Sequence, residues 1–291
     1  MNQPSGPVVS QPTDALSVGL SPAAFAQLSG FITRELGIKM PPDKLPMLQA
    51  RLQRRVHQLG LTSLDEYLDC LFDAERGEQE LVEFVNLVTT NKTDFFREPR
   101  HFQFLTETAL PSLPGAVTPG SRLDLWCAGC STGEEVYTLG MVVHEWQRGH
   151  PGSDFAILGT DISTRVLALA RAGIYREAQV APVPAALRHR YFLRGRSDAE
   201  LLRVVPELRG HMRFGRLNFM SEEYGLRAQF DVVFFRNVLI YFERATQEAI
   251  LQRICRHLRR GGYLFVSHSE SLVGFDLPLT NLGGSVFRRR P

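Results

Sequence analysis

Short apolar runs alternate with amphipathic segments from Arg122 to the C-terminus, and this alternation limits the fold more than any other feature of the chain. Runs typical of strands occupy residues 123–128, 155–160, 231–235 and 263–267, and a terminal edge strand is expected at 285–288. Segments with helical periodicity occupy residues 134–146, 164–172 and 245–258. Such an alternation predicts an α/β fold with a doubly wound, mostly parallel sheet.

Residues 183–220 interrupt the alternation. They contain short β-like runs at 202–205 and 212–214, without a clear crossover helix near the end of the segment. We therefore expect a small antiparallel β-subdomain at about 188–213, inserted into the larger sheet.

The chain before this region has helical periodicity only. Ser21-Pro22 is a typical helix start, because Ser caps a first turn and Pro is tolerated inside it. A second helix is expected over residues 43–59 and a third from Ser63 onward. The expected domains are an all-helical unit at 19–88, a linker at 89–104 that contributes to the functional site, and an α/β domain at 105–291.

The first 18 residues carry three prolines among Ser, Gln and Gly, which is typical of a disordered tail. They lack the basic and apolar regions of a signal peptide, so we expect the four cysteines to be reduced thiols in the cytoplasm. No apolar run approaches the roughly 18 residues of a membrane span. The formal net charge of +2 gives no overall attraction to nucleic acid or to a membrane.

The first predicted strand leads into Gly129-Cys130-Ser131-Thr132-Gly133, at the strand end where open α/β sheets bind ligands. Glu134 and Glu135 follow in the first helical turn, where they would repel the pyrophosphate of a dinucleotide. They fit S-adenosylmethionine (SAM), which is a net cation because it carries an ammonium and a sulfonium against one carboxylate. The alternative is that both glutamates only complement the helix dipole.

Polar residues stand at three further expected strand ends. Asp161 ends the second strand, and its carboxylate can accept two hydrogen bonds from a ribose diol. Capping of the next helix is the alternative, although Ser163 is the better cap. Asn218 and Asn237 offer a donor and an acceptor to an adenine edge or an amino group, and a turn alone would also explain each of them.

Two other patterns favour packing over chemistry. Cys127 and Cys130 have the spacing of a zinc pair, but no second pair with metal spacing exists, so we expect no metal. His268 lies between two serines, yet the ordered nucleophile, acid and histidine of a hydrolase are missing. Phe95 is expected to anchor a core.

Taken together, seven ordered segments strongly resemble the chemotaxis receptor glutamate O-methyltransferase family (CheR). They are Thr89–Glu98, Cys127–Tyr137, Thr160–Ser163, Gly173–Arg176, Asn218, Phe230–Phe242 and Ser267–Ser271. The similarity extends from about Leu20 to the C-terminus. It implies a helical N-terminal domain joined to a class I SAM-dependent methyltransferase domain that carries a small β-subdomain.

The resemblance also implies the residues that contact the cofactor. These residues are Asn91, Thr93, Arg97, Glu135, Asp161, Asn218, Phe219, Asn237 and Val238. With Gly129 of the glycine loop, they form the expected cofactor site. Of the two glutamates, it is Glu135 that the family uses. Lys92 and Asp94 stand where the family varies, and Val136 replaces a frequent proline.

The implied reaction transfers a methyl group from SAM to glutamate side chains on the cytoplasmic helices of chemoreceptors. The products are glutamate methyl esters and S-adenosylhomocysteine (SAH). A glutamate with a pKa of about 4.3 is already ionised at neutral pH, so we expect no general base. We expect Arg97 to hold the carboxylate of the cofactor or of the substrate, and Tyr241 to line the methyl channel.

The expected partners follow from the same resemblance. A basic flank of the second helix is either a solvated face or a docking site for acidic receptor helices, and it consists of Lys44, Arg51, Arg54 and Arg55. Some family members also bind a receptor C-terminal peptide at the β-subdomain. We expect a cytoplasmic monomer that neither binds nucleic acid nor inserts into a membrane.

Two other functions remain as alternatives. A nucleic-acid amino methyltransferase has an Asn/Asp-Pro-Pro-Tyr/Phe motif after its fourth strand, whereas this chain has Arg236-Asn237-Val238-Leu239 there. An adaptor that binds the cofactor without chemistry is disfavoured, because the implied set of cofactor contacts is intact.

Overall fold

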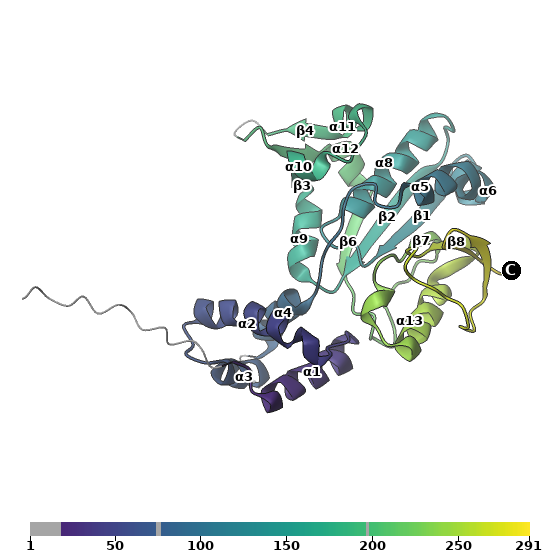
Figure 1. Ribbon diagram of the computed structural model, residues 1–291. Helices are drawn as coiled ribbons and strands as arrows, with labels where there is room; N and C mark the ends of the chain where they lie inside the picture. Colours follow the sequence, from purple (N-terminus) through teal and green to yellow (C-terminus); the bar gives the residue numbers. More distant parts are fainter. Residues whose placement is uncertain (1–18, 74–76, 196–197) are drawn as a thin grey trace, which may run out of the picture.

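The computed structural model describes residues 19–73, 77–195 and 198–291, so the expected disordered tail lies outside the described residues. Four helices form a separate N-terminal lobe (Figure 1): α1 (Pro22–Leu36), α2 (Leu45–Leu59), α3 (Leu64–Phe72) and α4 (Gly77–Val88). As predicted, Ser21 and Ser63 cap α1 and α3. The lobe has a core of its own, with Leu28, Ile32 and Phe84 fully buried.

Seven strands form the main sheet, in the order β6-β2-β1-β7-β8-β10-β9. Their bounds are β1 (Arg122–Ala128), β2 (Asp154–Asp161), β6 (Met212–Arg216), β7 (Phe230–Phe234), β8 (Leu258–Phe265), β9 (Leu279–Gly283) and β10 (Val286–Arg289). The five neighbouring strands β6, β2, β1, β7 and β8 are parallel, whereas β10 pairs antiparallel with β8 and β9. The predicted doubly wound sheet is confirmed, and its strand order reverses between β1 and β7.

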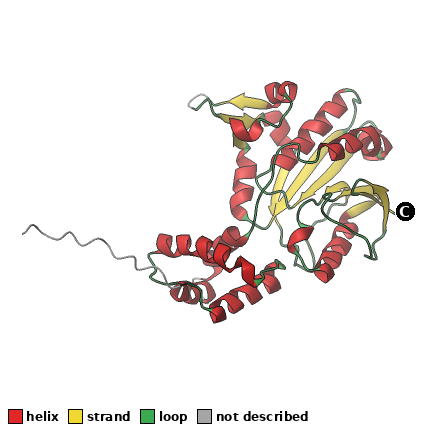
Figure 2. Cartoon of the chain, in the orientation of Figure 1, coloured by secondary structure: helices red, strands yellow, loops and turns green. Residues whose placement is uncertain are grey.

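Each face of the sheet is covered by helices (Figure 2). Leu125 and Cys127 of β1 pack on the side of α8 (Glu134–Arg148), while Trp126 and Ala128 pack on the side of α13 (Arg244–His257). This alternation follows from the two-residue period of a strand. A third crossover helix, α9 (Thr164–Ala172), is capped by Ser163 as predicted.

The segment that links the two domains is shorter than the predicted range of 89–104. Helix α5 (Pro99–Phe104) continues through a π-helical segment (Leu105–Ala109) into the short helices α6 (Leu110–Ser112) and α7 (Pro114–Val117). Phe102 and Leu105 are buried in the same core as β1 and α8. Residues 99–104 therefore belong to the α/β domain, since their apolar side chains complete its core.

The β-subdomain also differs from the prediction. A separate antiparallel sheet has the order β3-β5-β4, with strands β3 (Ile174–Arg176), β4 (Phe192–Arg194) and β5 (Leu201–Val204). Around these strands lie the short helices α10 (Glu177–Val180), α11 (Ala185–Tyr191) and α12 (Pro206–Gly210). The expected range of 188–213 was wrong at both ends, because the sheet begins at Ile174 and Met212–Phe214 belongs to β6 of the main sheet. A three-residue strand such as β3 is too short to show a period.

The C-terminal prediction needs a second correction. Strand β10 is not the edge strand, because β9 pairs with its outer side. Strand β9 was not predicted, because its run Leu279–Gly283 contains Thr, Asn and Gly and is mostly exposed. Among the residues that the structure describes, no helix combines the length and the apolar character needed to cross a membrane.

The helical lobe contacts the α/β domain through polar groups. Asn86 of α4 is buried, and its Oδ1 accepts hydrogen bonds from Ser163 Oγ (2.8 Å) and from the backbone N–H of Arg165 (3.2 Å). After α1, the Lys39 N–H donates to the Tyr241 carbonyl at 2.8 Å. These contacts place the ends of α1 and α4 beside the carboxyl ends of the central strands.

Candidate functional site

A cleft lies where the helical lobe meets the carboxyl ends of β1, β2 and β7, and its empty space, with the open solvent at its mouth, is about 970 Å³. Leu36 and Ile38 of the lobe form part of its wall. All the cofactor residues expected from the sequence line this cleft, together with Tyr241: Asn91, Thr93, Arg97, Gly129, Glu135, Asp161, Asn218, Phe219, Asn237 and Val238. The fold thus brings together residues that are up to 150 positions apart in the chain.

The glycine loop has a left-handed backbone at three positions. The φ angles are +79° at Gly129, +49° at Ser131 and +95° at Gly133. A Cβ on Gly129 would lie 2.5 Å from Val238 Cγ2, so the loop can approach the strand-end residue Val238 only if this position is glycine. Ser131 Oγ donates to the Asn91 carbonyl at 2.8 Å and thereby ties the loop to the segment after α4.

Asp161 is buried at the end of β2. Its Oδ2 accepts the Ser131 N–H at 2.9 Å, and its Oδ1 accepts the Ser163 N–H at 3.0 Å. Burial raises the pKa of Asp161, although these hydrogen bonds oppose the shift. Each carboxylate oxygen has further lone pairs, so the geometry leaves acceptors for two hydroxyl groups in the cleft.

The two glutamates of α8 have different surroundings. Glu134 is buried outside the lining of the cleft, and burial raises its pKa. Glu135 lines the cleft and pairs with Arg236, with 2.6 Å between Oε2 and Nε. Glu135, the glutamate that the resemblance implies as the cofactor contact, therefore lines the cleft, whereas Glu134 does not. The negative charge of Glu135 is also partly neutralised inside the protein.

Arg236 is the central residue of this region, and the sequence analysis did not assign it a role. Besides Glu135, its guanidinium donates to His101 Nδ1 at 2.9 Å and to the Arg97 carbonyl at 2.7 Å. It lies over the rings of Phe102 and Phe234 at 5.4 and 5.6 Å. A buried arginine needs several partners, but no local pattern of the sequence shows which residues these are.

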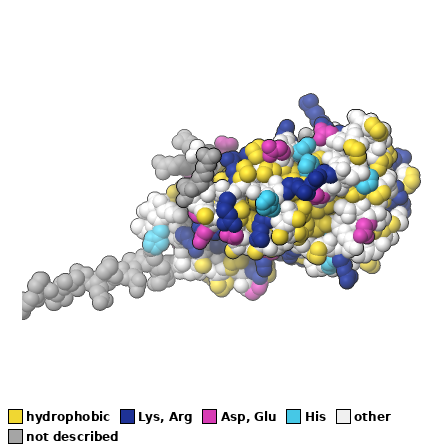
Figure 3. Space-filling model, turned by 90° about the horizontal axis from the view of Figure 1, so that it is seen from above, with side chains coloured by type: hydrophobic (Ala, Val, Ile, Leu, Met, Phe, Trp, Pro, Cys, Tyr) yellow, Lys and Arg dark blue, Asp and Glu magenta, His cyan; other side chains and the backbone are white. Residues whose placement is uncertain are grey.

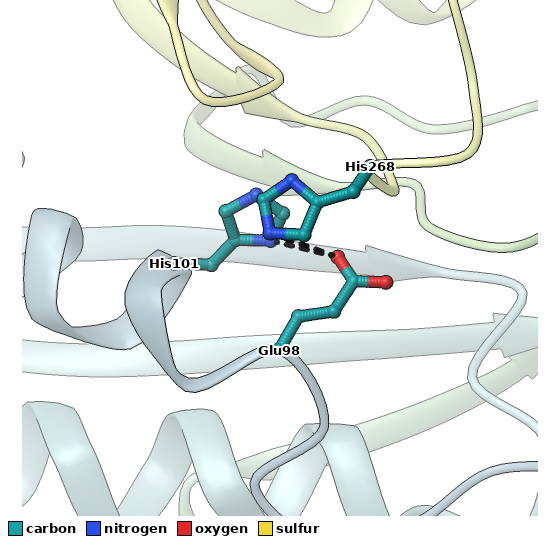
Figure 4. A group of neighbouring side chains, drawn as sticks. All are labelled: Glu98, His101 and His268. Carbon is teal, nitrogen blue, oxygen red and sulfur yellow. Dashed lines mark ion pairs between the residues drawn. The ribbon is translucent and has the colours of Figure 1, made fainter.

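Glu98, His101 and His268 lie together (Figure 4). Arg236 contacts the first two of them, since its Nη1 lies 3.7 Å from Glu98 Oε2 and 2.9 Å from His101 Nδ1. Glu98 Oε2 is 3.4 Å from His101 Nδ1 and 4.0 Å from His268 Nε2, and it is buried without a hydrogen-bond partner. Three such side chains could hold a metal ion. However, Arg236 donates to His101 Nδ1, the atom a metal would need, and so the geometry favours a hydrogen-bonded network.

Charge in this network is well defined. Burial raises the pKa of Glu98, but the hydrogen bond from Ser267 and the nearby Arg236 outweigh this effect and hold it below its ordinary value. Burial lowers the pKa of His101, whose Nε2 lies 2.9 Å from the Gly284 carbonyl. Glu98 is therefore ionised at neutral pH, and His101 is neutral with its proton on Nε2.

The two strand-end asparagines have different roles in the fold. The Asn218 side chain donates to the Glu35 carbonyl at 2.8 Å, so it ties the α/β domain to the end of α1. Asn237 has a left-handed backbone, with φ of +59°, and its Nδ2 donates to Ser267 Oγ at 2.6 Å. Asn218 thus uses one of its two amide hydrogens for the domain contact, whereas Asn237 keeps its oxygen for a ligand.

Cys127, Cys130 and Phe95 lie in the core of the α/β domain. Cys127 and Cys130 are fully buried, and burial raises the pKa of both thiols well above the ordinary value. Cys127 Sγ donates to Glu135 Oε1 at 3.2 Å, which supports the packing interpretation over a thiolate metal pair. Phe95 is also buried and packs edge-on against Tyr175, as expected for a core anchor.

The basic flank of α2 is only partly free. Arg51 donates to the carbonyls of Leu87, Val88 and Thr89 at 2.9 to 3.2 Å, where α4 ends. Arg55 pairs with the buried Glu80 at 2.7 Å. Lys44 and Arg54 are exposed, and Lys44 Nζ lies 3.7 Å from Asp43 Oδ2. Both remain accessible to a partner, because such exposed ion pairs are weak.

Two family models match the chain in agreement with this architecture. Residues 23–89 match the CheR methyltransferase all-alpha domain, and residues 91–287 match the CheR methyltransferase SAM-binding domain. The chain belongs to the CheR methyltransferase family. It is therefore a methyltransferase that uses SAM. Residues 91–104 of the expected linker fall within the SAM-binding domain.

Curated relatives of this CheR chain are similar over nearly their whole length. It is 36% identical to the chemotaxis protein methyltransferase of Escherichia coli K12, over 93% of this chain and 92% of the relative. The identity is 37% with chemotaxis protein methyltransferase 2 of Pseudomonas aeruginosa PAO1, over 90% and 91%. Among solved structures, the glycopeptide N-methyltransferase MtfA with SAM is 16% identical over 69% of this chain and 61% of that one, with a TM-score of 0.36.

Proposed function

We propose that this chain methylates glutamate side chains of chemoreceptors, which converts SAM and a glutamate carboxylate into SAH and a glutamate methyl ester. One observation carries this proposal. The lining of the cleft has three cations, Lys92, Arg97 and Arg236, against two carboxylates, so it offers excess positive charge to an anionic methyl acceptor. The names of the relatives, chemotaxis protein methyltransferases, support an acceptor that belongs to chemotaxis.

The residues of the cleft fit SAM, whose bound form supplies an electrophilic methyl group. Asp161 would accept hydrogen bonds from the ribose diol, and Asn237 and Glu135 would accept from amino groups. Gly129 lets the backbone approach the ligand without a Cβ in the way. No metal is part of the proposed site.

Methyl transfer to a carboxylate needs alignment and the exclusion of water more than proton transfer, because the acceptor is already ionised. Arg97 is half-buried at the cleft, and its Nη1 lies 3.4 Å from the Lys92 carbonyl, which orients the guanidinium. We assign Arg97 to a carboxylate of the cofactor or of the acceptor, and Tyr241 to the wall of the methyl channel. Burial raises the pKa of Tyr241, so its hydroxyl is neutral and can only donate or accept a hydrogen bond.

The proposal is tested with methyl-labelled SAM and membranes that contain chemoreceptors. We expect label on the receptor that is released as methanol by mild base, as a methyl ester requires. Label that resists base would indicate an amide or amine acceptor and would refute the glutamate assignment. Arg97→Ala and Tyr241→Phe separate the roles: loss of SAH affinity marks a cofactor contact, and loss of turnover at normal SAH affinity marks an acceptor contact.

Receptor docking is assigned to two surfaces. The first is the exposed pair Lys44 and Arg54, which would face acidic receptor helices. The face in Figure 3 carries Lys and Arg side chains beside Asp and Glu side chains, so this face has no uniform charge that would attract an acidic partner. The second is strand β4, an edge of the small sheet, where a receptor C-terminal peptide could add as a strand.

A binding titration of the protein with receptor tail peptides tests the β4 surface. Arg194→Pro, at a position of β4 whose N–H does not face β5, should lose peptide binding and keep SAH binding. Because the proposed acceptors lie on cytoplasmic receptor helices, we place the enzyme in the cytoplasm, acting as a monomer.

A further inference from the structure

The segment Ser267–Ser271 resembles a family motif, but none of its residues has a role in the proposed chemistry. In the structure it lies directly behind the cleft residue Asn237. Ser267 Oγ accepts a hydrogen bond from Asn237 Nδ2 at 2.6 Å and donates one to Glu98 Oε1 at 2.7 Å. Ser267 is therefore the link between Asn237 and the buried carboxylate that follows Arg97.

Glu270 holds the backbone of the same turn. Its Oε2 accepts the N–H groups of Asn237 (3.1 Å) and Ser267 (2.8 Å), and its Oε1 accepts that of Leu239 (2.8 Å). Asn237 has a φ of +59°, which a non-glycine residue adopts only at a cost. Three hydrogen bonds to one buried carboxylate offset this cost and keep the turn in place.

The charge of Glu98 decides which way the Asn237 amide points. An ionised carboxylate only accepts hydrogen bonds, so the single Ser267 hydroxyl proton must go to Glu98. Ser267 can then only accept from Asn237, and the group that faces it must be Nδ2. The Asn237 oxygen is thereby turned away from Ser267, on a side chain that lines the cleft.

We propose that Glu98, Ser267 and Glu270 are positioning residues that fix Asn237 as a hydrogen-bond acceptor for an amino group of the cofactor. This inference rests on the proposed cofactor role of Asn237. The cofactor has two such donors, the ammonium of its amino-acid part and the exocyclic amine of adenine. Because these hydrogen bonds fix its amide, Asn237 accepts a hydrogen bond from a donor group of the cofactor and disfavours an acceptor group at the same place.

Affinity for SAH and for two analogues tests the inference. One analogue carries hydrogen in place of the amino-acid ammonium, and the other has the adenine amine replaced by oxygen. Asn237→Ala first identifies the recognised donor, because it should weaken SAH but not the analogue that lacks this donor. Ser267→Ala and Glu98→Gln should each weaken SAH about 3- to 10-fold, as expected for one hydrogen bond, and leave that same analogue unaffected.

Glu98→Gln is the sharpest variant, since its amide can donate to Ser267 and so allow the Asn237 amide to flip. Glu270→Gln should act in the same direction, whereas Glu248→Gln should leave SAH binding unchanged. Glu248 is the matched control because it lies outside the lining of the cleft and accepts one backbone N–H, that of Asp276, at 3.0 Å. Thermal unfolding of every variant is measured in parallel.

The outcomes separate this inference from the proposed function. If Asn237→Ala leaves SAH affinity unchanged, the cofactor role of Asn237 is wrong. If Asn237→Ala weakens SAH but Ser267→Ala and Glu98→Gln do not, the positioning role is wrong. It is also wrong if these two variants weaken SAH and both analogues equally, because a general loss of structure would have that effect.

Discussion

Gly129→Ala adds one methyl group at the closest contact of the glycine loop. The new Cβ would lie 2.5 Å from Val238 Cγ2, a distance that forces one of the two chains to move. The φ of +79° at Gly129 adds a second cost, because an L-residue is strained there. Gly129 and Val238 both line the cleft, so any movement that relieves the contact also changes the shape of the cofactor site.

The two costs can be separated with a matched control. Left-handed backbone costs an L-residue about 1–2 kcal/mol, and overpacking costs about 1–3 kcal/mol. Gly120 has a φ of +78° but no atom within 4 Å of its ideal Cβ, so Gly120→Ala has only the first cost. We therefore expect Gly129→Ala to lower the free energy of unfolding by about 1–3 kcal/mol more than Gly120→Ala does.

Urea unfolding and calorimetric titration with SAH measure the two effects. Gly129→Ala should weaken SAH binding by roughly tenfold or more, the equivalent of about 1.4 kcal/mol, while Gly120→Ala should bind SAH normally. Adding Val238→Ala should restore part of the stability lost in Gly129→Ala, since the two positions are in contact. Equal stability of the two glycine variants, with normal SAH affinity in both, would refute the reasoning.

Two further predictions concern charge. Arg51→Glu should lower the free energy of unfolding by about 3 kcal/mol, because it removes a charged donor from three carbonyls at the end of α4. Arg54→Glu, at an exposed position, should leave stability unchanged and slow receptor methylation. Equal rates for Arg54→Glu and the wild type at low salt would argue against docking. Burial raises the pKa of Asp161, and ribose binding needs the ionised form, so SAH affinity should fall on acidification at a higher pH than for an ordinary aspartate. Titration between pH 7.5 and 4.5 should show this fall in the wild type and a flatter profile in Asp161→Asn.

Local signals predicted local structure well. Helix caps at Ser21, Ser63 and Ser163 stand where the sequence placed them, because capping depends on residues within one turn. The parallel strands β1, β2, β7 and β8 were predicted because buried strands are continuous apolar runs, whereas the partly exposed β6 was assigned to the insertion. Some residues of the cleft, such as Gly129 and Asp161, were indicated by their place at expected strand ends. Others, such as Asn91, Thr93 and Arg97, were implied by the family resemblance, which reports positions and not the partners of each side chain.

Partners across the chain were not predictable in this way. Arg236 meets Glu135, which lies 101 positions earlier, and only the paired strands β1 and β7 bring the two together. Asn218 lines the cleft, but the donation of its amide to the Glu35 carbonyl of the other domain was not predicted. Such contacts depend on tertiary packing, and no period or spacing in a single sequence encodes them.

The charge of the cleft differs from what the two glutamates of α8 predicted. Glu135 is paired with Arg236, and Glu134 lies outside the lining, so a cationic cofactor is not attracted by net negative charge. SAM must then bind through individual acceptors, while the excess positive charge favours the carboxylate of the methyl acceptor. Lys92 is exposed and lines the cleft, which makes its charge the easiest to remove.

Lys92→Gln should therefore affect the two substrates in opposite directions. We expect a lower kcat/KM for the receptor and a somewhat higher affinity for SAM, each by no more than about fivefold, because an exposed charge contributes at most about 1 kcal/mol. Arg100→Gln is the control, since Arg100 is exposed on the same segment but does not line the cleft. Weaker SAM binding in Lys92→Gln would mean that this ammonium holds the carboxylate of the cofactor, and the excess charge would then serve SAM rather than the receptor glutamate.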